Sequence, residues 1–268
     1  MTPYEKFIKI ADEAHYFDQH QEVLVALSGG LDSMTLFNCL YAARDLLNIS
    51  LSVSHINHQQ RAVSDYEAKA LQDKMADLEI PFYIANYVGP FSEEKARDFR
   101  YDFFERIMKK YHLTALVTAH HKDDLTENFL IRQIRGSRLR HLTGMEAVQT
   151  FGEERQGLSL IRPLLDFEKS EFDATDYFED ASNAENDYLR NRVRNLYLPA
   201  FEKENPRFSE NLAGLSDEIQ KAMAIVAYSA RAYAAAEKID LIEFSREIEN
   251  LQRSEEHTSE LQSRRDLV

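Results

Sequence analysis

The sequence predicts an α/β fold, in which a parallel, twisted sheet carries helices on both of its faces. Two observations favour this fold. Short apolar runs with strand character alternate along the chain with longer segments of helical spacing, and such alternation is typical of a parallel sheet. The 268 residues, 44% of them hydrophobic, are also enough to bury a full core and leave room for a smaller second part.

The expected elements follow one another in a regular order. Residues 23–27 are rich in valine and leucine and end at a glycine pair, as expected of a buried parallel strand that enters a turn. Further strands are expected at residues 49–54, 82–87 and 114–118, and helices at residues 33–47, 64–78 and 93–111. Because ligands of parallel sheets sit beyond the carboxyl ends of the strands, we expect residues 28–33, 55–61 and 119–124 to line one crevice.

The chain changes character after Pro199. Residues 208–252 show no strand signal and are rich in alanine, glutamate and leucine, which favour helices. We therefore expect a first domain at residues 1–205, followed at residues 206–252 by a helical linker and the start of a truncated second domain. Residues 253–268 are expected to be a non-native tail, because much of this segment resembles an in-frame translation of a sequencing-library adapter.

Composition excludes several classes of protein. The single cysteine, Cys39, rules out an intrachain disulfide, a CxxC redox pair and a cysteine-based metal site within this chain, and it is expected to be a small core residue. The N-terminal segment lacks the apolar core of a signal peptide, and no run approaches the ~18 apolar residues of a membrane span. We therefore expect a cytoplasmic protein without a membrane partner.

The balance of charge is acidic, with two local exceptions. A formal net charge of −14 argues against general affinity for nucleic acids. Residues 132–141, however, carry four arginines and no acid, and residues 190–194 carry three arginines in five positions. These two segments are where we expect phosphates to bind.

The first strand leads into a loop whose composition suits a phosphate, namely Ser28, Gly29, Gly30, Leu31, Asp32 and Ser33. A glycine pair before a helix lets backbone N–H groups approach an anion closely. The loop lacks the GxxxxGK[ST] pattern and its lysine, and Asp32 has the wrong charge for a phosphate unless Mg²⁺ lies between them. The alternative is an ordinary strand-to-helix turn capped by serine.

This six-residue string resembles the signature of the PP-loop ATP pyrophosphatases. The resemblance implies that ATP is cleaved to AMP and pyrophosphate, with adenylation of a carbonyl-type oxygen. It also implies a Rossmann-like fold for the first domain and makes Asp32 the candidate metal ligand.

Polar and charged residues follow the later strands as well. Imidazole, amide and guanidinium groups suited to a nucleotide or an RNA phosphate close the second strand at His55, Asn57, His58 and Arg61. The helix from residue 93 carries Arg97 and Arg100, for which a solvated charged face is the alternative. After the fourth strand come His120 and His121, and then Asp124 and Glu127, which share a helix face.

Two carboxylates at the edge of a pocket can hold a substrate that bears an ammonium group, although acidic residues can also simply complement the helix dipole. Together with Arg135-Gly-Ser-Arg138, Arg162-Pro-Leu-Leu and Arg190-Asn-Arg192-Val-Arg194, the series resembles the tRNA(Ile)-lysidine synthetase family over about residues 23–199. The resemblance implies ligation of free L-lysine to C2 of the wobble cytidine of the tRNA(Ile) that bears a CAU anticodon, through an adenylated cytidine.

The resemblance also implies roles for the residues. The loop Ser28–Ser33 would bind ATP with Mg²⁺ on Asp32, Arg100 and His120 would stabilise charge during adenylation, and Asp124 and Glu127 would bind lysine and accept its proton. Contacts to the tRNA or to phosphates are expected from His55, Asn57, His58, Arg61, Arg97, Arg135, Arg138, Arg190, Arg192 and Arg194. For any one arginine, an ion pair with an acid of this chain is the alternative.

Two other functions and one assembly question stay open at this point. A PP-loop tRNA thiolase would use the same adenylation but needs sulfur delivery, for which Cys39 alone is poorly suited. A non-catalytic nucleotide-binding protein could share the scaffold, since fold does not dictate function. Whether the chain forms a homodimer is also open.

Overall fold

The computed structural model describes residues 2–59, 63–89, 92–150, 158–179 and 186–237. The chain divides into two compact units, the first made of residues 1–137 and 144–214 and the second of residues 138–143 and 215–268. Arg61 and the expected tail at residues 253–268 lie outside the described residues. The expected domain bounds stay a prediction.

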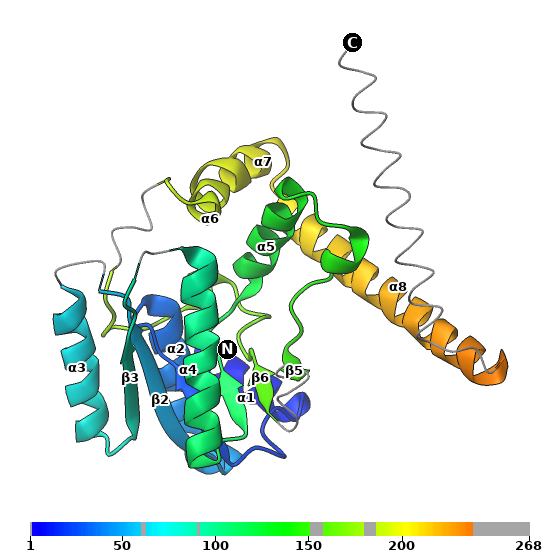
Figure 1. The fold of residues 1–268 in the computed structure, drawn as a ribbon. Coiled ribbons are helices and arrows are strands. Elements are labelled where there is room, and N and C mark those ends of the chain that lie inside the picture. The colour runs from blue at the N-terminus through cyan, green and yellow to red at the C-terminus, as the bar shows by residue number, and fades with distance from the viewer. Residues whose placement is uncertain (1, 60–62, 90–91, 151–157, 180–185, 238–268) are drawn as a thin grey trace. The chain divides into compact units, whose positions relative to one another are not determined.

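A sheet of six strands forms the centre of the first unit, in the order β3-β2-β1-β4-β6-β5 (Figure 1). The strands are β1 Glu22–Ala26, β2 Ser50–Asn57, β3 Phe82–Asn86, β4 Ala115–Val117, β5 Val148–Thr150 and β6 Ser159–Ile161. All neighbouring pairs are parallel except β5 with β6, which is antiparallel at one edge of the sheet. The expected parallel sheet is confirmed, with an antiparallel edge strand added to it.

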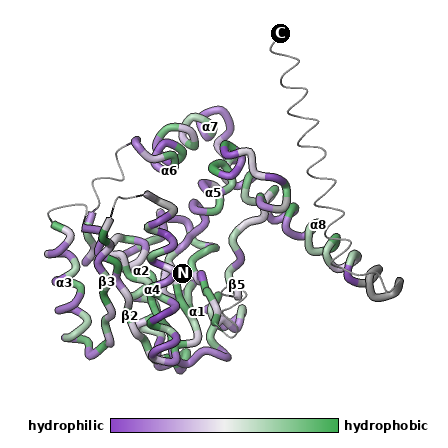
Figure 2. Tube along the Cα trace, viewed as in Figure 1, coloured by the Kyte–Doolittle hydropathy of each residue, from purple (hydrophilic) through white to green (hydrophobic). Residues whose placement is uncertain are grey.

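Helices cover both faces of this sheet, as the alternation of side chains along the strands requires. The helices are α1 Pro3–Glu13, α2 Leu31–Leu47, α3 Ser64–Asp77, α4 Glu93–Tyr111 and α5 Lys122–Ile134. Val23 and Val25 of β1 pack in one core cluster with residues of α1, α2 and α3, whereas Leu24 packs in a second cluster with Phe104 and Met108 of α4. In Figure 2, α3 carries hydrophobic and hydrophilic residues in alternation, as a helix with one face on a sheet does.

The rest of the first unit wraps around α5. A single turn, η2 Lys169–Glu171, follows β6, and later come α6 Leu189–Arg192, the π-helical turn η4 Val193–Tyr197 and α7 Leu198–Glu204. Val193 and Leu198 are buried against Ile131 of α5. This packing places the arginines of α6 and η4 beside α5.

The second unit contains the turn η1 Leu139–His141 and most of the helix α8 Phe208–Glu237, whose first residues belong to the first unit. Within this unit the hydroxyl of Ser216 donates a hydrogen bond to the carbonyl of Leu142 at 3.1 Å. In the part of the chain that the structure describes, no helix is both long and apolar enough to cross a membrane. The cytoplasmic location and a homodimer stay predictions.

Candidate active site

The loop between β1 and α2 is shaped by its first glycine. Gly29 has a φ of +90°, and a Cβ at this position would lie 2.9 Å from Phe178 and 3.3 Å from Leu71. Glycine is therefore required both for the backbone conformation and for the space. Gly30, with an extended backbone, is the N-cap of α2, so the loop ends at a helix N-terminus of the kind that binds anions.

The two serines of the loop have different roles in its geometry. The Ser33 hydroxyl accepts a hydrogen bond from the Gly29 N–H at 3.1 Å and donates one to the Gly30 carbonyl at 3.0 Å. The Ser28 hydroxyl lies 3.0 Å from that of Ser33, and Ser28 is exposed whereas Ser33 is buried. Ser33 thus holds the loop in shape, and Ser28 is the hydroxyl that an incoming ligand can reach.

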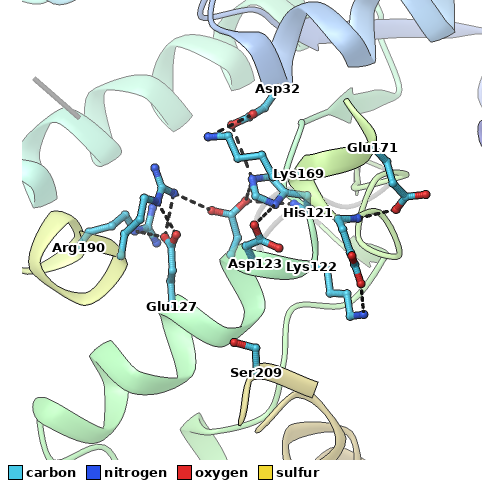
Figure 3. A network of polar contacts seen from close by, with 12 residues as sticks. Asp32, His121, Lys122, Asp123, Glu127, Lys169, Glu171, Arg190 and Ser209 are labelled. Atoms are coloured by element: carbon cyan, nitrogen blue, oxygen red, sulfur yellow. Dashed lines mark hydrogen bonds and ion pairs between the residues drawn. The ribbon is translucent and has the colours of Figure 1, made fainter. Parts of the chain in front are cut away.

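Asp32, in the first turn of α2, lies among positive charges (Figure 3). Its Oδ2 is 3.6 Å from Nε2 of His121, and its Oδ1 is 3.7 Å from Nζ of Lys169. Partial burial acts to raise the pKa of Asp32, but His121, Lys169 and Arg194 outweigh it, so this pKa lies below its ordinary value. Asp32 is therefore held as a carboxylate, with cations on two sides.

His121 is the N-cap residue of α5 and is almost completely buried, with 1% of its side chain exposed. Its Nε2 lies 3.5 Å from Asp124 as well as 3.6 Å from Asp32, and its ring meets Phe172 edge to face. Burial acts to lower the pKa of His121, but the contact with Asp32 and the charges of Asp124 and Asp123 raise it overall. His121 therefore lies between Asp32 of the loop and Asp124 of α5, and these carboxylates favour its protonated form.

Glu127 is tied to two arginines that come from far along the chain. The Arg194 guanidinium donates to both of its oxygens, at 2.5 and 3.0 Å, and Nε of Arg190 lies 3.7 Å away. Arg194 also lies 3.8 Å from Oδ1 of Asp124. The expected lysine-binding carboxylates and two of the expected phosphate-binding arginines thus form one network, in which 12% of the Asp124 side chain is exposed against 2% for Glu127.

A family model described as PP-loop domain matches residues 3–201, which include the loop and this network. The chain belongs to the PP-loop domain family. Membership of this family implies that the chain uses ATP. Residues 28–33 are called the PP-loop from here on.

This PP-loop chain is also similar to curated tRNA(Ile)-lysidine synthases. It is 52% identical to the tRNA(Ile)-lysidine synthase of Streptococcus sanguinis strain SK36 over 218 residues, which are 81% of this chain and 50% of that protein. It is 48% identical to the tRNA(Ile)-lysidine synthase of Lactococcus lactis subsp. lactis strain IL1403 over 227 residues, 84% of this chain and 53% of that protein. The chain spans about half the length of the curated relatives it matches.

Among solved structures, the chain is similar to the U34-tRNA thiolase NcsA from Methanococcus maripaludis. The TM-score is 0.61 over 81% of this chain and 78% of that chain, with 15% sequence identity. At this identity the likeness concerns the fold alone. The similarity to tRNA(Ile)-lysidine synthases, which the motifs predicted, is confirmed by the sequence relatives.

The residues of the PP-loop fit ATP and Mg²⁺. A Cβ at Gly29 would meet Phe178 and Leu71, so the turn that leads to the N-terminus of α2, a site suited to phosphates, requires glycine. Oδ1 of Asp32 is buried and has no hydrogen-bond partner among the described residues. Because Mg²⁺ commonly takes one or two protein carboxylates together with substrate phosphates, an available carboxylate oxygen beside the PP-loop fits that ion.

His120 differs from its neighbour His121 in the direction in which its pKa is shifted. Its Nδ1 lies 2.8 Å from the Thr118 hydroxyl. Burial lowers the pKa of His120 to about 4, and the positive charges of Arg162, Arg190 and Arg100 act in the same direction, against Asp124. An imidazole whose pKa is lowered in this way can donate a hydrogen bond without carrying a charge of its own.

Arg100 and His58 lie close enough to affect one another. Arg100 is exposed on α4, and its charge adds to the burial that lowers the pKa of His58 to about 4. The same charge acts on His120. These three residues, each expected at the site, therefore share one region of the first unit.

The other residues expected to contact phosphates are placed differently. The His55 ring lies 2.8 Å from the Leu27 carbonyl, and the Asn57 amide donates to Asp65 at 2.6 Å, so both side chains are buried in structural contacts. Arg192 donates to the carbonyls of Asn186 and Asp187. Arg97 and Arg135 are exposed, and Arg138 belongs to the second unit.

Sequence reasoning gave no role to two residues that the structure places next to Asp32. His121 was noted only as the neighbour of His120, although its position before an acidic first turn of α5 predicts that it meets carboxylates. Lys169 lies in a turn after a three-residue strand too short to be recognised from its pattern. Its contact with Asp32 therefore carries no local sequence signal.

Proposed function

We propose that this chain carries out the ATP-dependent ligation of L-lysine to C2 of the wobble cytidine of a tRNA(Ile) with a CAU anticodon. The observation that carries the proposal is identity at about half of the aligned positions to curated tRNA(Ile)-lysidine synthases, over 81% and 84% of this chain. The PP-loop, Asp124 and Glu127 lie within residues 3–201, which the family model matches. The clustering of these groups within one compact unit supports it.

The first step is adenylation of the cytidine. The C2 oxygen attacks the α-phosphate of ATP, a bond to AMP forms, and pyrophosphate leaves. The PP-loop and the N-terminus of α2 hold the phosphates, Asp32 would hold Mg²⁺, and Arg100 and His120 stabilise the negative charge that develops. When bound, Mg²⁺ would screen the phosphate charges and favour the departure of pyrophosphate.

The second step replaces AMP by lysine. The ε-ammonium of free lysine has a pKa near ~10.4 and must lose a proton before its nitrogen attacks C2. AMP then leaves with the former C2 oxygen. Asp124, whose Oδ1 meets Arg194 only at 3.8 Å, is the more accessible acceptor of that proton, and Glu127, closed by Arg194, shapes the ammonium site beside it.

The tRNA would meet the positive residues around this site. We assign its phosphates to Arg97 and Arg135, which are exposed, with further contacts from Arg190 and Arg192. His58 and Arg61 follow β2 and are assigned to the same partner, as is Arg138. His55 and Asn57 would shape the loop that presents them.

Sulfur transfer, the nearest other reaction, lacks a reactive group in this chain. Cys39 is the single cysteine of the 268 residues, is 6% exposed in the core, and has a pKa raised to about 11 by burial. A thiol of this kind stays protonated and unreactive at neutral pH. The residues of this chain therefore favour lysine over sulfur as the second substrate.

The proposal is tested by incubating the chain with ATP, labelled lysine and unmodified tRNA(Ile) that carries CAU. The matched control is the methionine tRNA with the same anticodon. We expect label in the isoleucine tRNA alone, with one pyrophosphate released for each lysine joined. Pyrophosphate release without label in either RNA would exclude lysine as the substrate that replaces AMP.

A further inference from the structure

Lys169 reaches the PP-loop from a part of the chain that none of the motifs includes. It is the first residue of η2, in the loop that follows β6, and 41% of its side chain is exposed. The turn that carries it is held on both sides. Glu168 accepts a hydrogen bond from Lys122 of α5 at 2.9 Å, and Glu171 accepts one from Lys6 of α1 at 2.8 Å. The backbone around Lys169 is therefore anchored to α5 and to α1.

The contact that Lys169 makes differs from these two anchoring pairs (Figure 3). Its Nζ lies 3.7 Å from Oδ1 of Asp32, longer than a hydrogen bond, and that oxygen has no hydrogen-bond partner among the described residues. A committed lysine–carboxylate pair is close to 2.8 Å, as in the two anchors. Lys169 is thus held near Asp32 by charge, without a hydrogen bond that a ligand would have to break.

We propose that Lys169 binds the pyrophosphate portion of ATP and stabilises it as it leaves. The inference rests on the ATP-binding part of the proposed function. The PP-loop contains no lysine, and its one charged residue, Asp32, is an anion. If Asp32 meets the β- and γ-phosphates through a cation, then an ammonium group 3.7 Å from Asp32 lies within reach of the same phosphates.

The chemistry of lysine suits this role. Its ammonium group is a compact charge on a flexible stem of four methylene groups, so Nζ can turn from Asp32 to a phosphate oxygen while η2 stays in place. As pyrophosphate departs, negative charge accumulates on its oxygens, and a cation that contacts them lowers the barrier to departure. Lys169 supplies from another loop the positive charge that Walker-type loops carry within the motif.

The test measures binding of three ligands to the purified chain by calorimetry in the presence of Mg²⁺, namely ATP, inorganic pyrophosphate and AMP. We expect Lys169→Ala to weaken the binding of ATP and pyrophosphate by about tenfold to a hundredfold, as loss of one charge-assisted hydrogen bond does, and to leave AMP within twofold. Lys169→Arg, which keeps the charge, should retain most of the affinity for pyrophosphate. Lys122→Ala removes one of the two anchors of the same turn and leaves the other, between Lys6 and Glu171, so it should change each of the three affinities by less than about twofold.

Several outcomes overturn the inference. The inference is rejected directly if Lys169→Ala binds pyrophosphate as tightly as the unmodified chain, or if the unmodified chain does not bind pyrophosphate. Equal losses for AMP and pyrophosphate, or an equal loss in Lys122→Ala, would give Lys169 a structural role only. None of these measurements involves lysine or tRNA, so failure of lysine ligation with pyrophosphate binding intact would reject the proposed function and leave this inference standing.

Discussion

The PP-loop and the carboxylate network of α5 lie in the same unit, but they are built over very different distances along the chain. The PP-loop is shaped by hydrogen bonds among Gly29, Gly30 and Ser33, all within five residues. Glu127 depends on Arg194, 67 residues away, and Asp32 depends on His121 and Lys169, which come from two other loops. A phosphate cradle can thus be local, whereas a charged pocket is assembled by the whole fold.

This difference predicts that the two regions fail separately, and the largest expected effect is on lysine transfer. In Asp124→Asn the amide still offers an oxygen to the His121 N–H, so the start of α5 is kept, but the proton acceptor is lost. We expect lysine incorporation to fall by about 10²–10⁴-fold, with pyrophosphate release retained. Labelled-lysine transfer and pyrophosphate release are measured side by side.

Asp123→Asn is the matched control for this prediction, because Asp123 is the adjacent acid and has 46% of its side chain exposed. It should behave as the unmodified chain. Unchanged lysine incorporation in Asp124→Asn would remove Asp124 from the proposed mechanism. Equal losses in both activities would mean that the two regions do not work separately.

The second prediction concerns the stability of the carboxylate network. Arg194→Ala leaves Glu127 buried with Arg190 at 3.7 Å as its remaining cation. Removing one partner of a buried ion pair typically costs about 3–5 kcal/mol, and Arg190 should offset part of that, so we expect the free energy of unfolding to fall by about 3 kcal/mol. Urea denaturation measures it.

Arg192→Ala, two residues earlier, is the control. Its guanidinium donates to backbone carbonyls at the surface, so we expect a loss below about 1 kcal/mol. The short distances between Glu127 and Arg194 indicate that Glu127 depends on this arginine. An equal fall in the free energy of unfolding in Arg194→Ala and Arg192→Ala would contradict that dependence.

The third prediction breaks the PP-loop instead. Gly29→Ala adds a Cβ at a φ of +90° and 2.9 Å from Phe178. Backbone strain and overpacking together should lower the free energy of unfolding by about 2–4 kcal/mol. Gly136→Ala separates the two causes, because its φ is +72° but a Cβ there meets no described atom within 4 Å. We expect Gly136→Ala to cost about 1–2 kcal/mol and to leave ATP binding intact, which calorimetry checks.

The same contrast explains what could be predicted from sequence. Strands β1 to β4 and the PP-loop were predicted because apolar runs and a glycine pair are local signals. β4 has only three residues, but all three are apolar and buried. β5 and β6 are equally short, include polar residues and were missed. The antiparallel edge of the sheet was missed with them.

The site shows the same limit. Asp32 and the pair Asp124 and Glu127 were selected from position within a motif, but their partners were not, because an ion pair between residues 67 apart leaves no local pattern. For Arg190 and Arg194, the alternative noted from the sequence, an ion pair with an acid of this chain, describes the contacts that the structure shows.

The smallest expected effect concerns two adjacent imidazoles, His121, which lies between Asp32 and Asp124, and His120, which meets the Thr118 hydroxyl. Burial lowers the pKa of His120 from 6.5 to about 4, so the unfolded chain takes up this proton first as the pH falls, and stability is lost between about pH 6.5 and 4. The pKa of His121 is raised by its carboxylate neighbours, so its contribution is present at low pH and is lost as the pH rises through the folded pKa. Both variants are compared with the unmodified chain by urea denaturation from pH 5 to 8. His120→Gln should remove about 1–2 kcal/mol of the fall in the free energy of unfolding at acid pH, a range that allows for partial screening by solvent. His121→Gln should make that fall steeper. Parallel stability curves for the two variants would show that neighbouring histidines do not differ in charge, and that the network of Asp32, His121 and Asp124 is not held together by a cation.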